Sequence, residues 1–268
     1  MTNLGNYSVL VVGCDKHRKL LDRFFLQFTR YWNDPTVDIY LSLEDEDYSY
    51  GDLKIKVTNF GSSWSTRVKK TLEQINSSAI LLLLDDFLVE SPVEHEELNK
   101  LAELISSTDE IAHFALTTVP MKNQSDTLFY DKYYLRHHFG RYKTTLQAGM
   151  WNRKELISVI KPGESAWSFE IQANFRSYLS ERKYYAIAKK ELKPIEYNEG
   201  LFCIQGKLNT YELDRLKEKF DEDFRVDGME DNGGVIIRDP CPFIKKIFRK
   251  IKVITYDLVY RLKWWFKK

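Results

Sequence analysis

The sequence predicts a layered α/β domain with a mostly parallel central sheet, followed by a separate basic amphipathic helix. Short β-branched or apolar runs alternate with segments in which apolar residues recur every three or four positions, as strands alternate with covering helices. The run of six apolar residues at 79–84 is apolar on both faces, which is typical of a central strand between helices. With 268 residues, 43% of them hydrophobic, the chain can bury a sizeable core and is not a disordered segment.

The first half of the chain alternates regularly between the two patterns. Strands are expected at residues 8–12, 37–43, 53–57, 79–84 and 111–118. Helical spacing of apolar residues predicts helices at 16–32, from Ser63 to residue 75, and after residue 91. Ser91, Pro92 and Glu94 form a capping-box pattern with proline at the first helical position, which should start the third helix. This alternation implies sequential right-handed crossovers.

The second half of the chain is less regular. Strands are expected at 133–138 and 144–150, with an edge strand at 184–190, and helices at 152–160, after Ser165 and at 210–220. In the helix after Ser165, the spacing predicts a buried face made of Trp167, Ile171, Phe175 and Leu179. Residues 228–234 are expected to separate this body from the C-terminal segment.

Charge is distributed unevenly along the chain. Residues 241–268 contain nine Lys or Arg and one Asp, whereas residues 1–240 carry a net charge of −7. An acidic body lacks the basic face that nucleic-acid phosphates require, which argues against a nucleic-acid partner. The three cysteines, Cys14, Cys203 and Cys241, are too scattered for a disulfide framework or a CxxC metal site, so a reducing compartment fits best.

The sequence also lacks the patterns of a signal peptide and of a membrane span. No basic stretch precedes the short apolar run at 8–12, and no window approaches the ~18 apolar residues of a membrane span. We therefore expect the body to stay in the cytoplasm.

Two adjacent acids, Asp85 and Asp86, directly follow the most apolar strand. Ligands of open α/β sheets bind outside the carboxyl ends of the strands, where these acids should lie. Adjacent carboxylates repel each other unless a cation lies beside them, and Mg²⁺ or Mn²⁺ bound also to phosphate oxygens suits such hard oxygen ligands. The alternative is a solvated turn in which one Asp caps a backbone group.

Three further residues could bind the same ligand. Ser63 and Arg67 lie in the first turn of a helix, where free amide groups attract anions such as a pyrophosphate. Asp15, just after the first strand, could meet a base or ribose in the same crevice. The alternatives are an exposed Arg beside Lys69 and Lys70, and an ordinary loop Asp.

Glu170 is the candidate for proton transfer. It follows Trp167 by three residues, so a position beside this ring would partly desolvate the carboxylate, raise its pKa and make it a better base towards a sugar hydroxyl. The alternative is a boundary glutamate in water, with Glu164 as the second choice of base. The signatures GxxxxGK[ST], GxGxxG, GxSxG and HExxH are absent, which disfavours P-loop enzymes, dinucleotide dehydrogenases, α/β-hydrolases and zincins.

Four short motifs resemble those of bacterial GT-A-type glycosyltransferases that assemble surface polysaccharides. They are W-S-x-R at 64–67, I-L-L-L-L-D-D-F-L at 80–88, Q-A-G-M-W at 147–151 and S-A-W-S-F-E at 165–170, within a resemblance that covers residues 8–205. The resemblance implies a GT-A-like catalytic domain at 1–235, with a nucleotide-sugar half at 1–120 and an acceptor half at 121–235. It also implies a divalent cation, although the family's D-x-D is replaced here by adjacent acids; Asp86, or else Asp85, is then the expected metal ligand, and metal dependence stays open.

The same resemblance implies roles for individual residues. A nucleotide diphosphate sugar is expected to contact Asp15, Ser63, Arg67, Asp85, Asp86, Gln147 and Trp151. Trp167 is expected on the acceptor side, and Glu170 is expected where inverting members carry their base.

The C-terminal segment, residues 240–268, repeats apolar residues every three or four positions among many basic ones and ends in aromatic residues. A basic amphipathic helix of this kind lies in the membrane interface and is attracted to anionic lipids. The alternative is a helix that packs on the acidic body or on a partner subunit.

Together these observations predict a glycosyltransferase, resembling hexosyltransferases, peripheral on the inner face of the cell membrane. It would move a sugar from a nucleotide diphosphate sugar to a lipid-linked glycan acceptor with inversion. Two other classes stay open: a metal-dependent phosphodiesterase or nucleotidyltransferase that uses the same acids, and a non-catalytic membrane-anchored scaffold.

Overall fold

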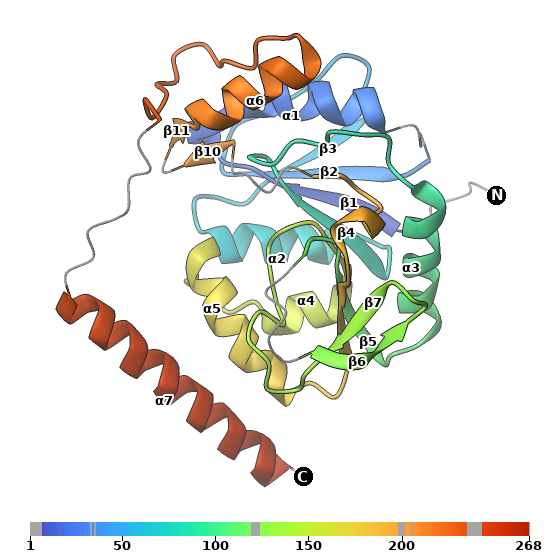
Figure 1. The fold of residues 1–268 in the computed structure, drawn as a ribbon, viewed down its shortest axis with the longest axis vertical. Helices are drawn as coiled ribbons and strands as arrows, with labels where there is room; N and C mark the ends of the chain where they lie inside the picture. Colours follow the sequence, from blue (N-terminus) through green and yellow to red (C-terminus); the bar gives the residue numbers. More distant parts are fainter. Residues whose placement is uncertain are drawn as a thin grey trace.

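The computed structural model describes residues 7–32, 34, 36–118, 124–197, 202–204, 206–234 and 243–267. A single sheet of nine strands runs through the body, with helices on both of its faces (Figure 1). In sheet order the strands are β3 (Ile55–Asn59), β2 (Asp38–Leu43), β1 (Tyr7–Val12), β4 (Ala79–Leu84), β8 (Gly149–Asn152), β5 (Ile111–Ala115), β9 (Lys183–Ile187), β7 (Tyr133–Arg136) and β6 (Gln124–Phe129).

The sheet is mostly parallel. β3, β2, β1 and β4 form an uninterrupted parallel block, and among the nine strands only β8 and β7 run in the opposite direction. The predicted α/β class with a mostly parallel central sheet is therefore confirmed.

Helices cover the sheet in two layers. On one face lie α1 (Arg18–Tyr31), α3 (His95–Ser107) and α6 (Thr210–Phe220); their buried side chains share one core. On the other face lie α2 (Trp64–Gln74), α4 (Arg153–Val159) and α5 (Ala166–Arg176), which share a second core. Because successive side chains of a strand point to opposite faces, each central strand feeds both cores.

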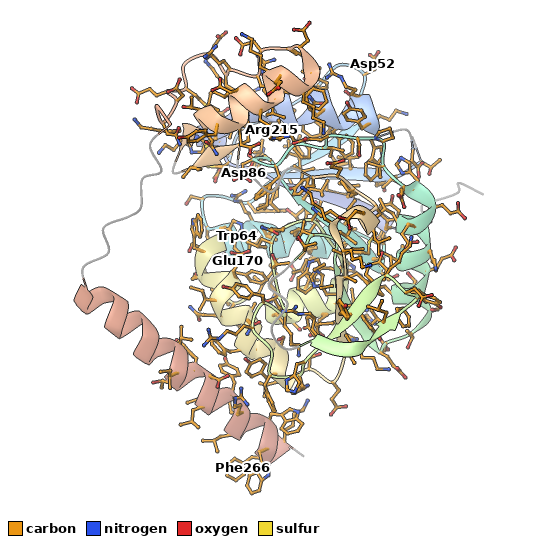
Figure 2. The ribbon with its side chains drawn as sticks, viewed as in Figure 1. Asp52, Trp64, Asp86, Glu170, Arg215 and Phe266 are labelled. Carbon is orange, nitrogen blue, oxygen red and sulfur yellow. The ribbon has the colours of Figure 1, made fainter. Side chains whose placement is uncertain are left out.

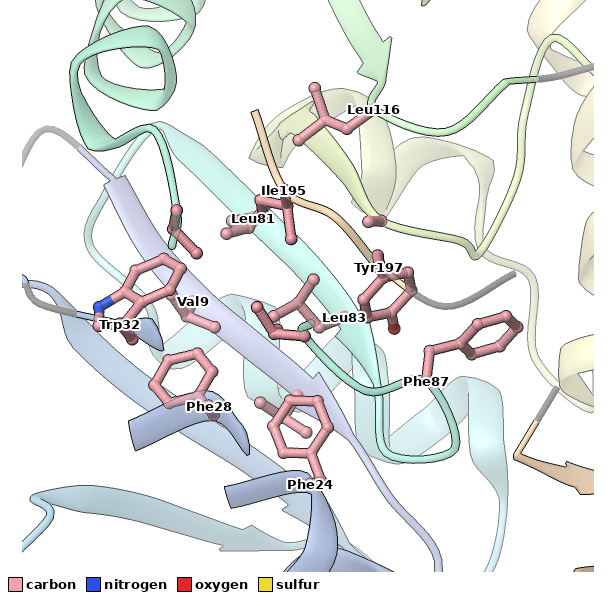
Figure 3. Close-up of a cluster of buried hydrophobic side chains, with 14 of the residues drawn as sticks. Val9, Phe24, Phe28, Trp32, Leu81, Leu83, Phe87, Leu116, Ile195 and Tyr197 are labelled. Carbon is pink, nitrogen blue, oxygen red and sulfur yellow. The ribbon is translucent and has the colours of Figure 1, made fainter. Parts of the chain in front are cut away.

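Strand β4 shows this division most clearly. Leu81 and Leu83 enter the core under α1 and α3, where they pack with Phe24 and Phe28 (Figure 3), whereas Ile80 and Leu82 enter the core under α2 and α4. From Ala79 to Leu83 every side chain of β4 is fully buried, as expected for a central strand.

The predicted capping box before α3 does not form. The helix begins at His95, and its N-cap residue Glu94 makes no side-chain capping bond. The backbone before α3 instead pairs with a distant segment: Glu90 N–H donates to Glu196 O, and Glu94 N–H donates to Pro194 O. These long-range bonds hold the segment extended and delay the start of the helix.

Two further predictions in the second half were wrong. The strand expected at the edge, β9, lies inside the sheet between β5 and β7. In α5, the buried side chains include Phe169 and Ala173, whereas Trp167 is 77% exposed and Ile171 is 43% exposed. The cap at Ser165 is correct: its hydroxyl accepts the Ser168 N–H in a reciprocal capping box.

Smaller elements complete the body. Two single-turn 3₁₀ helices, η1 (Asp15–His17) and η2 (Ser177–Leu179), follow β1 and α5, and a short hairpin pairs β10 (Cys203–Ile204) with β11 (Lys207–Leu208). The last helix, α7 (Phe243–Lys267), contacts α5 and η2. Among the described residues, no helix combines the length and apolar character needed to cross a membrane.

Candidate functional site

The carboxyl ends of β1 and β4 lie side by side and bring a glycine against an aspartate. The two strands pair in parallel up to Val12 and Leu84, so Gly13 and Asp85 emerge together at the edge of the sheet. A Cβ atom at Gly13 would lie 3.2 Å from Asp85 Oδ2. The absence of a side chain at Gly13 therefore lets the carboxylate stand at this edge.

Burial and mutual repulsion disfavour the charged forms of the two acids. The pKa of Asp85 is raised well above its usual value, first by burial and then by Asp86, while Arg67 opposes this shift. The pKa of Asp86 is raised to about 6, first by burial, with a further contribution from Glu170. Asp85 Oδ2 is buried and has no hydrogen-bond partner in the described part of the chain. A bound cation would stabilise both carboxylates.

Arg67 lies in the interior next to this pair. Its Nη1 donates to Gly13 O and Ser42 O, both at 2.8 Å, and its Nη2 lies 3.2 Å from Glu44 Oε1. The guanidinium thus joins the ends of β1 and β2, and protein groups already compensate its charge. Its predicted contact with a donor diphosphate stays a prediction.

Asp15 organises the loop that follows β2. Its carboxylate accepts the backbone N–H groups of Glu44, Asp45 and Glu46 at 3.0, 2.9 and 3.1 Å. Burial opposes the charged form, but these backbone bonds outweigh it and lower the pKa of Asp15. Asp15 therefore fixes the loop after β2 beside the end of β1, and its contact with a base or ribose stays a prediction.

Ser63 stands at the N-cap position of α2. It is exposed, and its hydroxyl donates to Thr66 Oγ1 at 3.0 Å. The next residue, Trp64, packs on Phe169 of α5 with 5.3 Å between ring centroids. The start of α2 thereby touches the helix that carries Glu170.

Glu170 of α5 lies close enough to the acidic pair to act on Asp86. Its Oε1 accepts the Leu146 N–H at 3.1 Å, and its charge contributes to the raised pKa of Asp86. Figure 2 shows Asp86, Trp64 and Glu170 on the same side of the molecule. Donor-side and acceptor-side candidates thus lie within electrostatic range of each other.

The expectation that the Trp167 ring desolvates Glu170 was wrong. Because the Trp167 side chain is 77% exposed, it does not desolvate Glu170. Glu164, the second choice of base, is buried and paired with Arg176 at 2.7 Å, so it stabilises the fold instead.

The two donor-sugar residues from the motif at 147–151 differ in position. Gln147 is half-buried near the end of β5 and accepts the Thr117 hydroxyl at 2.8 Å, so it can reach the edge of the sheet. Trp151 is fully buried and stacks on His113, with 3.8 Å between ring centroids. On β8 it pairs with Ile80 of β4, four residues before Leu84, so it lies away from the strand end that carries the acids. Its predicted contact with a donor sugar stays a prediction.

Tyr197 is a neighbour of the acidic pair that sequence analysis did not identify. Its hydroxyl donates to Leu84 O and accepts from Leu84 N–H, and its ring stacks on Phe87 at 5.0 Å. Burial raises the pKa of Tyr197, and Asp86 and Asp85 raise it further. No periodic pattern marks this position, because Tyr197 lies in an irregular segment outside the named strands.

The protein supplies only some of the ligands that a divalent cation needs. No group of three or more His, Cys, Asp or Glu side chains converges on a common point among the residues that the structure describes. Asp85 and Asp86 nevertheless offer hard oxygen ligands, including one without a partner. One or two carboxylates suffice for Mg²⁺ when substrate phosphates supply the other ligands.

Comparisons with known proteins give structural matches alone. No protein-family model and no curated protein sequence matches the chain. The crystal structure of S. aureus TarS 1–349 is similar, with a TM-score of 0.43, 13% identity, and coverage of 67% of this chain and 59% of that one. The structure of TarS 1–349 in complex with UDP-GlcNAc has a TM-score of 0.42 at 13% identity and covers 69% of this chain and 58% of that one. The chain therefore spans less than two thirds of the TarS structures that it resembles.

Proposed function

We propose that the chain is a glycosyltransferase that takes a sugar from a nucleotide diphosphate sugar. The observation that carries this proposal is the position of Asp85 and Asp86 at the carboxyl end of β4, with Glu170 of α5 close enough to shift the pKa of Asp86. Ligands of open α/β sheets bind at this edge. A group for the leaving diphosphate and a base for the acceptor thus flank one crevice, and the four sequence motifs support the same activity.

Direct displacement at the anomeric carbon fits this arrangement. Glu170 takes the proton of the acceptor hydroxyl while that oxygen forms the new bond to the anomeric carbon; the bond to the diphosphate breaks, and its electron pair leaves with the diphosphate. Attack from the opposite side inverts the anomeric centre. The Leu146 N–H bond fixes the orientation of the Glu170 carboxylate before the acceptor arrives.

Asp86, with Asp85 beside it, would hold Mg²⁺ or Mn²⁺ in this proposal. A bound cation would supply positive charge to the leaving diphosphate. The raised pKa values of both acids fit this role, because a cation would stabilise the charged forms that burial, and then nearby carboxylates, now disfavour.

We further propose that the acceptor is a lipid-linked glycan and that α7 holds the enzyme on the inner face of the membrane. Residues 241–268 carry nine basic residues and one acidic residue, and α7 exposes large apolar side chains. Anionic lipids attract such a helix to the headgroup region.

Ligand binding by the full chain tests the donor assignment. Thermal unfolding is followed with nucleoside diphosphates and nucleotide sugars, beginning with UDP and UDP-GlcNAc, with and without Mn²⁺. A ligand that binds only the native state at 100 times its Kd stabilises it by about 2.7 kcal/mol. We expect a shift that Asp86→Ala abolishes and that the exposed control Glu230→Gln retains.

Transfer assays test the role of Glu170 separately. Glu170→Gln should retain the ligand-induced shift and lose transfer by about 10²-fold or more. Transfer at the normal rate would remove Glu170 from the mechanism. No shift with any nucleotide would refute the donor assignment itself.

A further inference from the structure

Large apolar side chains lie exposed on both α5 and α7. On α5, Trp167 is 77% exposed and Ile171 is 43% exposed. The exposed set on α7 spans 48–77% exposure and comprises Ile254, Leu258, Leu262, Trp265 and Phe266. Such a concentration of apolar side chains marks an interaction surface.

Helix α7 is docked on the body through its other face. Tyr256 stacks on Phe175 with 6.0 Å between ring centroids, and Trp264 lies 5.2 Å from Phe139. The Arg261 guanidinium lies 4.5 Å above the Phe139 ring, and Lys267 Nζ donates to Leu179 O at 3.1 Å. One face of α7 therefore packs on the body, while its other large apolar side chains stay exposed.

The angular positions of residues around α5 show what lies between its contact with α7 and the candidate active site. With about 100° between successive residues, Ile171 lies about 40° around the helix from Phe175, Trp167 about 80° and Glu170 about 140°. Phe175 contacts α7, and Glu170 lies within electrostatic range of Asp86. The exposed pair Trp167 and Ile171 therefore lies between the α7 contact and the active-site carboxylate.

We propose that α5 and α7 form one membrane-binding surface that reaches the rim of the acceptor site. The surface consists of Trp167 and Ile171 together with the exposed apolar set of α7. The proposal rests on the proposed function in one respect. Such a surface would let a lipid-linked acceptor reach Glu170 while its lipid stays in the bilayer.

Charge identifies an anionic bilayer as the occupant. Lys263 of α7 is exposed, and Arg261 and Lys267 also stay exposed beside their contacts with the body, in a segment with nine basic residues and one acidic residue. Tryptophan and phenylalanine suit the headgroup boundary, and basic residues beside them meet anionic headgroups. A second copy of the chain fits less well, because two equivalent α7 faces would bring like charges together.

Vesicle sedimentation of the full chain tests the surface without any turnover. Vesicles of phosphatidylcholine with about one third anionic phosphatidylglycerol are compared with pure phosphatidylcholine vesicles, because the anionic headgroups are what should attract a basic helix. The variants are Trp167→Ser/Ile171→Ser on α5, Leu258→Ser/Leu262→Ser on α7, and Tyr211→Ser as a control. Tyr211 is 63% exposed on α6, away from the proposed surface.

Both double variants should lose about tenfold or more in binding to anionic vesicles, since each removes two large apolar side chains from the bilayer contact. Tyr211→Ser should bind like the parent protein, and all proteins should bind pure phosphatidylcholine weakly. Unchanged binding of Trp167→Ser/Ile171→Ser would confine the surface to α7 and overturn the proposal. Equal binding to both kinds of vesicle would also overturn it, because charge would then play no part.

Two acceptors separate a membrane contact from an acceptor contact on α5. Ile171→Ser, which keeps the expected acceptor-side residue Trp167, should lose transfer to a vesicle-embedded acceptor but keep transfer to a short water-soluble acceptor. Loss of both activities with normal vesicle binding would place Ile171 on the acceptor and contradict the membrane surface. Glu170→Gln should bind vesicles normally, so failure of the catalytic assignment is distinguishable from failure of the surface.

Discussion

Arg67 connects the strand ends that form the acidic edge. Its buried guanidinium donates to carbonyl oxygens of Gly13 and Ser42 and pairs with Glu44, while its charge also lowers the pKa of Asp85. One side chain thus holds the two strand ends together and partly compensates the acids. An arginine that presents several donors in a fixed geometry suits this task better than lysine.

Replacing Arg67 should therefore weaken both the fold and the site. Arg67→Met removes a charged donor from the carbonyl groups of Gly13 and Ser42 and the counter-charge of Glu44, which should cost about 3 kcal/mol or more in the free energy of unfolding. Chemical denaturation measures this loss. Arg18→Met is a matched control, since Arg18 forms an exposed pair with Glu46 and should cost less than about 1 kcal/mol. Equal, small losses in both variants would contradict the structural role of Arg67.

The raised pKa of Asp86 makes a pH prediction. Its pKa is about 6 in the folded protein and about 3.9 in an unfolded chain. Between these values the folded state binds more protons, so the free energy of unfolding should fall as pH rises from about 4 to 6 and then level off. The contribution is at most about 3 kcal/mol.

Comparison with Asp86→Asn separates the acidic pair from other carboxylates; the pKa of Asp85 should fall in this variant, because Asp86 contributes to its rise, and this acts in the same direction. Asp15 and Glu90 have lowered pKa values and act in the opposite direction, but they are present in both proteins. The stability of Asp86→Asn relative to the parent should therefore increase from pH 4 to pH 6. A constant difference across this range would show that Asp86 titrates normally.

At the scale of elements, local patterns predicted where strands and helices lie along the chain. They predicted less well which of their side chains are buried and which elements they pack against. β4 extends over the predicted range, 79–84, because six consecutive apolar residues have few alternatives to a central strand. The phase of α5 was wrong because Trp167 and Ile171 fit a helical stripe as well as Phe169 and Ala173 do. Tertiary packing against Trp64 and the sheet selects the second stripe.

The capping box of α5 gives a prediction at this scale. The Ser165 N–H donates to the Ser168 hydroxyl, and the Ser168 N–H donates to the Ser165 hydroxyl. These two bonds close the first turn of the helix. Ser165→Ala should lower the free energy of unfolding by about 1 kcal/mol. Ser91→Ala, which lies where no capping box forms, should have a smaller effect, and urea denaturation of the two variants compares them directly.

For the whole molecule, the alternation of strands and helices was enough to predict two helical layers around one sheet. The sheet order was less predictable, because β8 joins β4 and β5 only after a long excursion of the chain, and β9 becomes central only when β7 and β6 pair beyond it. The acidic pair was predictable from its strand. Tyr197 and the roles of Arg67 and Asp15 were not, since each depends on backbone groups brought together from distant segments.

The arrangement of α7 on the body leads to a prediction about orientation. Trp264 packs on Phe139 and His138, whereas its neighbour Trp265, about 100° further around the helix, is 66% exposed. Trp264→Ala should loosen α7 from the body while leaving its outer apolar face intact. Amide hydrogen exchange in α7 should then become faster, whereas exchange in the central strands should stay unchanged.

Trp265→Ala is the matched control, because it removes an equally large side chain from the face that does not touch the body. It should leave exchange in α7 unchanged and weaken binding to anionic vesicles. Trp264→Ala should show the reverse: near-normal vesicle binding, but slower transfer to a vesicle-embedded acceptor, since the active site is no longer held at a fixed angle to the bilayer. If both variants weakened vesicle binding equally with no change in exchange, α7 would act as a free helix and its docking would have no bearing on orientation.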